Sequence, residues 1–423
     1  MNKYYLLFAL LFTSGLFAQT FEADLQVRPR FEYRNGYKTL LQEDADAASH
    51  TSQRTRLILG YADEALKVKF SGQSIGVWGD SPTMRLEDNN AFTIFEAYGQ
   101  YQTSPDFLFR LGRQVLSYDN QRILGEVGWA QQAQSHDAAL ISWKPAVNHR
   151  LDIAAAYNAE AESLIEMPYR INSYQNMQMA WYHMDVNNVG FSFLLMNTGY
   201  EFDTPLQDRE VDYIQTFGAF HNFVSGNLSG DVGAYGQTGS RNDRDVSAWY
   251  AGLNLNYKVT DLWRVGVGGE YLSGTDMNDT SGEINSFTPL FGTNHGFNGH
   301  MDYFYVGNHQ NSVGLLDLYG KISYVTPKFE FSIMPHVFSS AATVVDAAGN
   351  VQDDYLGTEI DFAAGYKIRK DLGINFGYSQ MFGSESLEIL KGGDKDRTQN
   401  WAWVMVSFSP KLFSYTKPAV SAQ

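Results

Sequence analysis

The 423-residue sequence contains no cysteine, and it contains no apolar run long enough to cross a bilayer as a helix. The first absence excludes disulfides and lipid attachment through a cysteine. The second excludes an ordinary helical membrane protein but not an outer-membrane barrel, whose strands are apolar only at every second residue. Amphipathic helix periodicity of useful length is also absent. These absences leave β-strands as the main structure to expect.

The stretch from Phe21 to Arg34 alternates strictly. Its odd positions are apolar or aromatic, and its even positions are charged or carry an amide. Period two is the side-chain repeat of a β-strand, whose successive residues face opposite ways. Similar alternation recurs along the chain, for example from Leu151 to Tyr157 and from Trp249 to Tyr257.

The chain begins with a pattern typical of a secretory signal. A basic residue, Lys3, precedes an apolar segment from Tyr4 to Phe12, and Ala18 offers a cleavage point. We expect three parts: a signal peptide at 1–18, a transmembrane β-barrel at 19–408, and a periplasmic tail at 409–423. Export without disulfides is normal for a large barrel, which is held by its hydrogen-bond ladder.

Short turns and long polar loops separate the expected strands in alternation. Eight short turns and nine long loops predict about eighteen antiparallel strands, in an all-β single barrel with short periplasmic turns and long extracellular loops. A soluble β-sandwich is the alternative, but it does not require strict short–long alternation. A closed barrel of this size leaves an aqueous channel. The expected long loops are 35–52, 79–91, 117–136, 159–177, 199–211, 238–245, 274–314, 340–354 and 383–399.

Cations gather on the expected inward face of the first five strands. One-sign charge on a low-dielectric wall attracts counter-charged solutes, and arginine offers a planar fork that suits carboxylates. The alternative is a neutral lumen, in which these cations pair with Glu32, Glu96, Asp317, Glu330, Glu359 and Asp361. The candidate lumen residues are Arg28, Arg30, Glu32, Arg34, Arg54, Arg56, Lys67, Lys69, Glu96, Arg110 and the neighbouring Arg113.

Several ordered motifs resemble the alginate-export family of outer-membrane channels. They are Arg-Pro-Arg-Phe-Glu-Tyr-Arg at 28–34, Gln-Arg-Thr-Arg at 53–56, Leu-Gly-Arg-Gln at 111–114 and Tyr-Asp-Asn-Gln-Arg at 118–122, followed by Trp129 and by His136-Asp137. The motifs span about the first third of the mature chain. The resemblance implies a monomeric eighteen-stranded barrel with an arginine-lined pore that passes anionic uronate polysaccharide outward. It assigns pore positions to Arg28, Arg30, Glu32, Arg34, Arg54, Arg56, Arg113, Asp119 and Arg122.

Two long loops invite specific expectations. Asp119 and Arg122 are expected to hold their loop against the barrel mouth, although an ordinary solvated loop is the alternative. Loop 274–314 contains no Lys or Arg. It could fold into the pore or lie in solvent. Within it, residues 276–283 superficially suggest a calcium loop, but the glycine falls one residue late and the bidentate glutamate is missing, so no metal is expected.

The sequence favours a passive outer-membrane channel for an anionic, uronate-type polysaccharide or oligosaccharide. A general porin with crossed lumen charges is the alternative. A barrel enzyme is a weaker one, because no nucleophile elbow, zinc-binding histidine pair or complete dinucleotide loop is present. We expect no cofactor and no nucleic acid partner. The expected partners are the anionic glycan, outer-membrane lipid and periplasmic export proteins.

Overall fold

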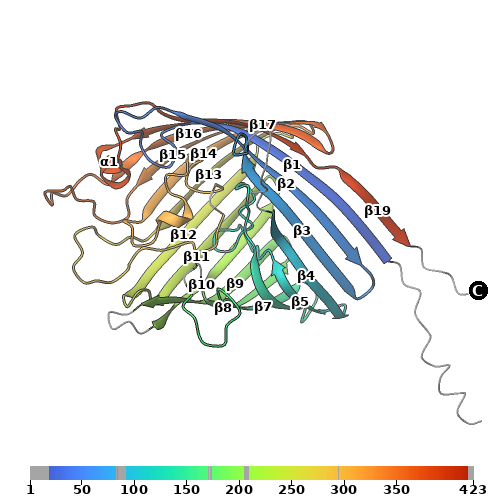
Figure 1. Ribbon diagram of the computed structural model, residues 1–423. Helices are drawn as coiled ribbons and strands as arrows, with labels where there is room; N and C mark the ends of the chain where they lie inside the picture. Colours follow the sequence, from blue (N-terminus) through green and yellow to red (C-terminus); the bar gives the residue numbers. More distant parts are fainter. Residues whose placement is uncertain are drawn as a thin grey trace, which may run out of the picture.

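The structure is a computed structural model that describes residues 19–81, 83, 92–169, 171, 174–203, 209–293 and 295–417. The expected signal peptide lies outside these residues. The chain forms one antiparallel sheet closed into a barrel (Figure 1). Its strands are β1 Gln19–Asn35, β2 Ala48–Ala62, β3 Leu66–Val77, β4 Phe92–Ser104, β5 Phe107–Gln114, β6 His136–Trp143, β7 His149–Tyr157, β8 Asn176–Val186, β9 Val189–Asp203, β10 Arg209–Ser225, β11 Leu228–Ser240, β12 Asp245–Lys258, β13 Trp263–Leu272, β14 Leu315–Val325, β15 Phe329–Ser339, β16 Tyr355–Arg369, β17 Leu372–Gly383, β18 Gln399–Phe408 and β19 Lys411–Lys417.

The barrel closes at β1, which pairs with β2 on one side and with both β18 and β19 on the other. The last two segments are halves of one strand that is interrupted around Pro410, so the barrel has eighteen strands, as predicted. The interruption has a simple cause, since proline has no backbone N–H to donate to the ladder. Part of the expected tail at 409–423 is therefore barrel wall, because residues 411–417 pair with the start of β1.

The two faces of β1 are those that the alternation predicts. Phe31 and Tyr33 are exposed on the outer face, whereas Arg28, Arg30 and Glu32 are buried on the inner face. The same sorting holds on β12, whose Trp249, Leu253 and Tyr257 are exposed. Exposed apolar side chains in a continuous outer band are what a barrel in a lipid bilayer requires.

The connections differ at the two ends of the barrel. Eight short turns lie at one end, which we call the turn end. The long connections, together with the short connections 204–208 and 241–244, lie at the other, the loop end. Two expected loops are too long: β9 and β10 extend to leave only 204–208 between them, and β11 and β12 leave only 241–244. Polar residues in these strand extensions still take part in the backbone ladder, where Glu201 of β9 lies opposite Val211 of β10.

Helix is sparse in the described chain. A 3-10 turn, η1, covers Val306–Asn308, and the helix α1 covers Glu385–Lys391 within the expected loop 383–399. The Ser384 side chain caps α1 by accepting from the Leu387 backbone N–H. No helix among the described residues has the length and apolar character needed to cross a membrane.

Candidate channel constriction

The connection between β5 and β6, residues 115–135, folds into the barrel, and we call it the first inner loop. Its Leu116, Ile123 and Leu124 are buried in one cluster with inward side chains of the wall. Burying each such side chain contributes about 1.5–3 kcal/mol, which accounts for the loop leaving solvent. The wall residues of this cluster include Leu140 on β6, Met177 and Met179 on β8, and Leu194 and Met196 on β9.

The connection between β13 and β14, residues 273–314, is the second inner loop, and it pairs with the first. The Gly125 N–H donates to the Phe291 carbonyl at 2.9 Å, and the Phe291 N–H donates to the Ile123 carbonyl at 3.1 Å. A side chain at Gly292 would collide with the Arg122 carbonyl, so this approach requires glycine. Of the two possibilities that the sequence left open for loop 274–314, folding into the barrel is the one observed.

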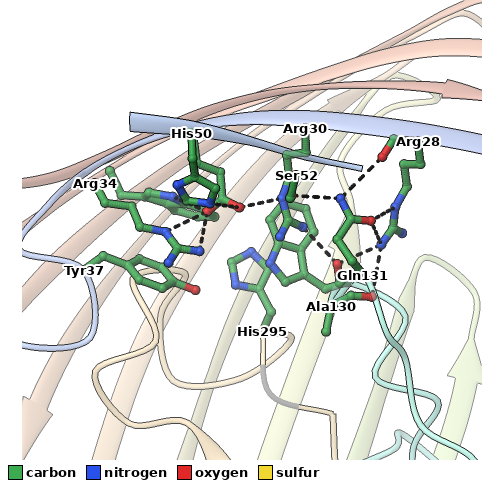
Figure 2. A network of polar contacts seen from close by, with 12 residues as sticks. Arg28, Arg30, Arg34, Tyr37, His50, Ser52, Ala130, Gln131 and His295 are labelled. Atoms are coloured by element: carbon green, nitrogen blue, oxygen red, sulfur yellow. Dashed lines mark hydrogen bonds and ion pairs between the residues drawn. The ribbon is translucent and has the colours of Figure 1, made fainter. Parts of the chain in front are cut away.

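Arg28 on β1 binds the first inner loop entirely through neutral acceptors (Figure 2). Its Nη1 donates to the Gly128 carbonyl at 2.8 Å, and its Nη2 donates to the Trp129 and Ala130 carbonyls at 3.0 and 3.1 Å. Its Nε donates to the Gln131 side-chain oxygen at 3.2 Å. The planar guanidinium group thus holds three successive peptide carbonyls.

Two arginines of β2 extend this arrangement. Arg54 Nη1 donates to the Gln131 carbonyl at 3.1 Å. Arg56 donates from Nε and Nη2 to the Gln73 side-chain oxygen at 2.9 and 2.7 Å, and its guanidinium carbon lies 3.7 Å from the centre of the Phe95 ring. Both side chains are about 4% exposed. These two arginines lie against the first inner loop and Gln73 instead of open water.

Glu32 joins the other two arginines of β1. Its Oε1 lies 2.9 Å from Arg30 Nε, and its Oε2 lies 2.9 Å from Arg34 Nη2. Trp401 on β18 also donates to Oε2, at 3.1 Å. Arg30 continues to the first inner loop, where it donates to the Trp129 carbonyl at 2.9 Å. Figure 2 shows that these groups and those around Arg28 form one layer between β1 and the loops.

The remaining cations predicted for the lumen have varied surroundings. Lys69 forms an ion pair with Glu96. Arg110 donates to the Gln100 side-chain oxygen at 3.0 and 2.8 Å. Lys67 is exposed near the turn end of β3.

Arg113 does not face the lumen. Its Nη1 pairs with Asp137 of β6 at 2.6 Å, and both side chains are exposed beside the lipid-facing Leu111. The neighbouring Gln114 and His136 are buried on the inner face. Because Arg113 lies three residues from the inward Arg110, strand alternation places it on the opposite face.

Asp119 and Arg122 both contact the wall from the first inner loop. Asp119 accepts from the Trp181 indole of β8 at 3.2 Å. Arg122 is 1% exposed, and its Nη2 lies 2.9 Å from Glu270 of β13 and 2.8 Å from the Asn298 side-chain oxygen. These contacts suit the expected anchoring of the loop inside the barrel, although the anchoring role stays a prediction.

The wall formed by β13 to β16 carries buried carboxylates. Asp317 contacts His336 at 2.9 Å, Glu359 accepts from the Met301 N–H at 2.7 Å, and Asp361 accepts from the His300 N–H at 3.2 Å. Among the described residues, none of these three acids lies within ion-pair distance of an arginine or lysine. Of the acids in the neutral-lumen alternative, Glu32 and Glu96 do pair with predicted lumen cations. No local pattern in the sequence encodes the histidine and loop partners of the other acids.

Two cavities lie beside this wall. A cavity of about 370 Å³ is lined by Tyr319, Lys321 and His336 among others. A second cavity, of about 570 Å³, shares Lys321 and adds Arg264 and Glu330. The two cavities adjoin and form the part of the lumen below the inner loops.

The described residues contain no group of three or more His, Asp or Glu side chains placed to hold a metal ion. In the segment that superficially suggests a calcium loop, Asp279 accepts from the Ser281 and Gly282 N–H groups. Asp276 accepts from the Thr343 N–H at 2.6 Å. Each carboxylate is therefore used in organising the second inner loop and its neighbour.

A family model described as alginate export matches residues 20–398. The chain belongs to the alginate export family. The alginate-export chain also shares its fold with solved Pseudomonas aeruginosa structures. The outer membrane protein OpdK is 12% identical, with a TM-score of 0.62 over 94% of this chain and 99% of that one. OccK5 (OpdH) is 12% identical, with a TM-score of 0.60 over 93% and 98%. None of the curated proteins matches the chain.

Family membership and the barrel together make this alginate-export protein an integral outer-membrane channel, not an enzyme. Its short turns then lie on the periplasmic side, and its inner loops enter from outside. The sequence motifs located the arginines and the first inner loop. They did not indicate the contribution of the second inner loop. The apolar side chains of loop 115–135 could have indicated that the loop is buried, because a solvated loop gains no stability from them.

Proposed function

We propose that the channel passes an anionic, uronate-type polysaccharide or oligosaccharide, and that the arginines of β1 and β2 provide the attraction. One observation carries this proposal. Arg28, Arg54 and Arg56 bind carbonyl and amide oxygens, and among the described residues no carboxylate lies within ion-pair distance of them. Neutral acceptors take most of these N–H groups, whereas Arg54 Nε has no acceptor among the described residues. The negative charge of Glu126, and for Arg56 also that of Glu96, acts on these arginines only from beyond ion-pair distance.

Arg28, Arg30, Arg34, Arg54 and Arg56 form what we call the arginine layer. The charge balance around this layer also supports attraction of anions. Glu32 is the one carboxylate that pairs within it among the described residues, and it serves both Arg30 and Arg34. Within this layer, five guanidinium groups of β1 and β2 therefore share one carboxylate, because the other acids of β1, Glu22 and Asp24, lie nearer the turn end. In a low-dielectric wall such an excess raises the local concentration of anions. A uronate chain carries one carboxylate per sugar unit, so it gains from a repeated positive field.

The carboxylates of β13 to β16 oppose the positive field of the arginine layer only in part. Glu270 is paired with Arg122. The buried Asp317 lies against His336. Lower in the lumen, Lys321 and Arg264 line the same cavity as Glu330, whereas the adjoining cavity is lined by Lys321 with Asp231, Glu270 and Asp317.

The test compares flux of a short oligouronate with that of its carboxyl-reduced, neutral counterpart through proteoliposomes. The wild-type channel is expected to pass the oligouronate faster. The double variant Arg54→Gln, Arg56→Gln is expected to lose most of the preference for the oligouronate. Arg113→Gln is the control for each single replacement, because it removes one positive charge from the outer face. Equal flux of both oligomers through the wild-type channel would overturn the proposal.

A general porin with crossed charges is the second candidate, and one observation favours it. The lumen wall carries both the arginines of β1 and β2 and the buried carboxylates of β13 to β16, and opposed charges orient small polar solutes. Liposome swelling with neutral sugars separates the two functions. Swelling at similar rates with neutral and anionic solutes would favour the porin.

A further inference from the structure

A separate cavity of about 310 Å³ lies at the loop end, between the wall at β9 to β12 and the second inner loop. Tyr200, Gln237, Arg241, Ser286 and Phe291 are among its lining residues. None of the lumen cations predicted from the sequence borders it. Its volume is at the lower limit of small-molecule sites, so it suits one sugar unit and not a length of chain.

Arg241 is the charged group of this cavity. Its guanidinium carbon lies 3.6 Å from the centre of the Tyr200 ring, which holds it in place from one side. Its Nε and Nη1 are buried, and neither has an acceptor in the described part of the chain. The nearby carboxylate of Asp212 is engaged elsewhere, by the Ser240 hydroxyl at 2.7 Å and the Asp243 N–H at 2.8 Å.

Arg244, three residues later, shows what a structural arginine in this connection does. Its Nε donates to the Gly282 carbonyl at 2.6 Å, and its Nη2 donates to the Glu283 carbonyl at 3.1 Å. A buried charged donor without an acceptor is costly. The two arginines of one short connection thus differ, and Arg241 is the one whose donors remain available.

A second unused polar group borders the cavity. Ser286 is 1% exposed, and its hydroxyl oxygen has no partner among the described residues. Gln237 beside it is fixed, because its amide donates to the Thr288 carbonyl at 2.8 Å and accepts from the Thr288 N–H at 3.0 Å. The cavity therefore combines a rigid wall, an unpartnered hydroxyl, unpartnered guanidinium N–H groups and the aromatic ring of Phe291.

We propose that this cavity is an outward-facing subsite for a single uronate unit. Arg241 donates to one oxygen of the sugar carboxylate from its unpartnered Nη1. Ser286 bonds a ring hydroxyl, and Phe291 offers an apolar face to the sugar ring. The inference rests on the proposed function, since it takes the transported polymer as its ligand. It adds a holding point on the extracellular side of the constriction.

The test records single channels in planar bilayers while a short oligouronate is added to the loop-end side. The expected result is reversible current blockades whose residence time falls about tenfold or more in Arg241→Gln, which corresponds to about 1.4 kcal/mol. Arg241→Lys keeps the charge but loses the planar guanidinium group that Tyr200 holds in place, and it is expected to shorten the blockades as well. Ser286→Ala removes one hydrogen bond, so a fall of about two- to tenfold is expected. Arg244→Gln is the matched control and is expected to leave the residence time unchanged.

Two results would overturn the subsite. One is an equal effect of Arg241→Gln and Arg244→Gln, and the other is equal blockade by the carboxyl-reduced oligomer. If the variants still prefer anions in either case, the proposed function stands without the subsite. Heat-modifiable mobility on gels shows whether each variant folds. Should Arg241→Gln fail to fold, unchanged blockades in both Arg241→Lys and Ser286→Ala would overturn the proposal.

Discussion

Arg28 and Arg113 mark how far strand alternation can assign single residues. Alternation from Phe21 correctly places Arg28 on the inner face. The same rule excludes Arg113, because it lies three residues from Arg110, but the motif in which it occurs led to its assignment to the pore. Partners are less accessible than faces. Arg28 binds carbonyls about a hundred residues away in the chain, and no local pattern encodes that distance.

The contact between Arg122 and Glu270 predicts strong coupling at the residue scale. Arg122→Met leaves a buried carboxylate with its tyrosine and asparagine donors but without a cation. The expected cost in unfolding free energy is about 3 kcal/mol. Adding Glu270→Gln is expected to recover much of that loss, because the uncompensated charge is gone.

Urea unfolding of the purified barrel in detergent, followed by tryptophan fluorescence, measures this double-mutant cycle. Additive losses in the double variant would mean that the ion pair does not anchor the first inner loop. Asp119→Asn is a useful comparison, because its contact is a hydrogen bond from Trp181 with no opposite charge.

Individual elements were predicted unevenly. Strands were found because their faces differ in polarity. The connections at 199–211 and 238–245 were drawn too long, since strand ends beyond the lipid are polar on both faces and resemble loops. The helix α1 was missed although its signals are present: Ser384 as cap, Glu385 and Glu388 in the first turn, and Gly392 after its end. Its seven residues are too few for a clear period.

The second inner loop is expected to respond to acid through His309. Burial, and then the positive charge of Arg122, lower the pKa of His309 to about 3. Its Nε2 lies 2.8 Å from the Phe304 carbonyl, so this nitrogen carries the hydrogen of the neutral ring. When the loop opens, the imidazole regains an ordinary pKa near 6.5. Because the folded pKa is the lower one, the open state binds more protons between pH 6.5 and 3, and the folded loop loses stability as pH falls.

At pH 5 this loss is about 2 kcal/mol relative to neutral pH. Channel recordings are expected to show more frequent conductance fluctuations as pH falls from 7 to 5. His309→Gln keeps a donor without titrating, and it is expected to reduce the change. The same acid response in wild type and His309→Gln would assign it to another group.

The whole molecule was the most predictable level. Strict alternation of short turns and longer loops determines the number of strands, and an even number places both chain ends on one side. Closure was only partly foreseen. Pro410 resembles the end of the last strand, because it cannot donate to a ladder, yet residues 411–417 resume pairing with β1.

This second half of the final strand predicts an assembly defect on truncation. Ending the chain after Ser409 removes the partners of Gln19 to Asp24, including the ion pair between Lys411 and Glu22 at 2.6 Å. It leaves one edge of β1 unpaired, and open edges favour misassembly. A lower yield of heat-modifiable, folded barrel is expected. A truncated chain that folds as well as the full one would show that β19 is dispensable for closure.

The central claim is that the arginine layer of β1 and β2 gives the lumen a net preference for anions. The reversal potential of the purified channel under a salt gradient tests it most directly. We expect the sign of the reversal potential to indicate preference for anions. The preference is expected to be strongest at low ionic strength, where screening is weakest, and to fall when Arg54 and Arg56 are both changed to glutamine. A clear cation preference at low salt would contradict it.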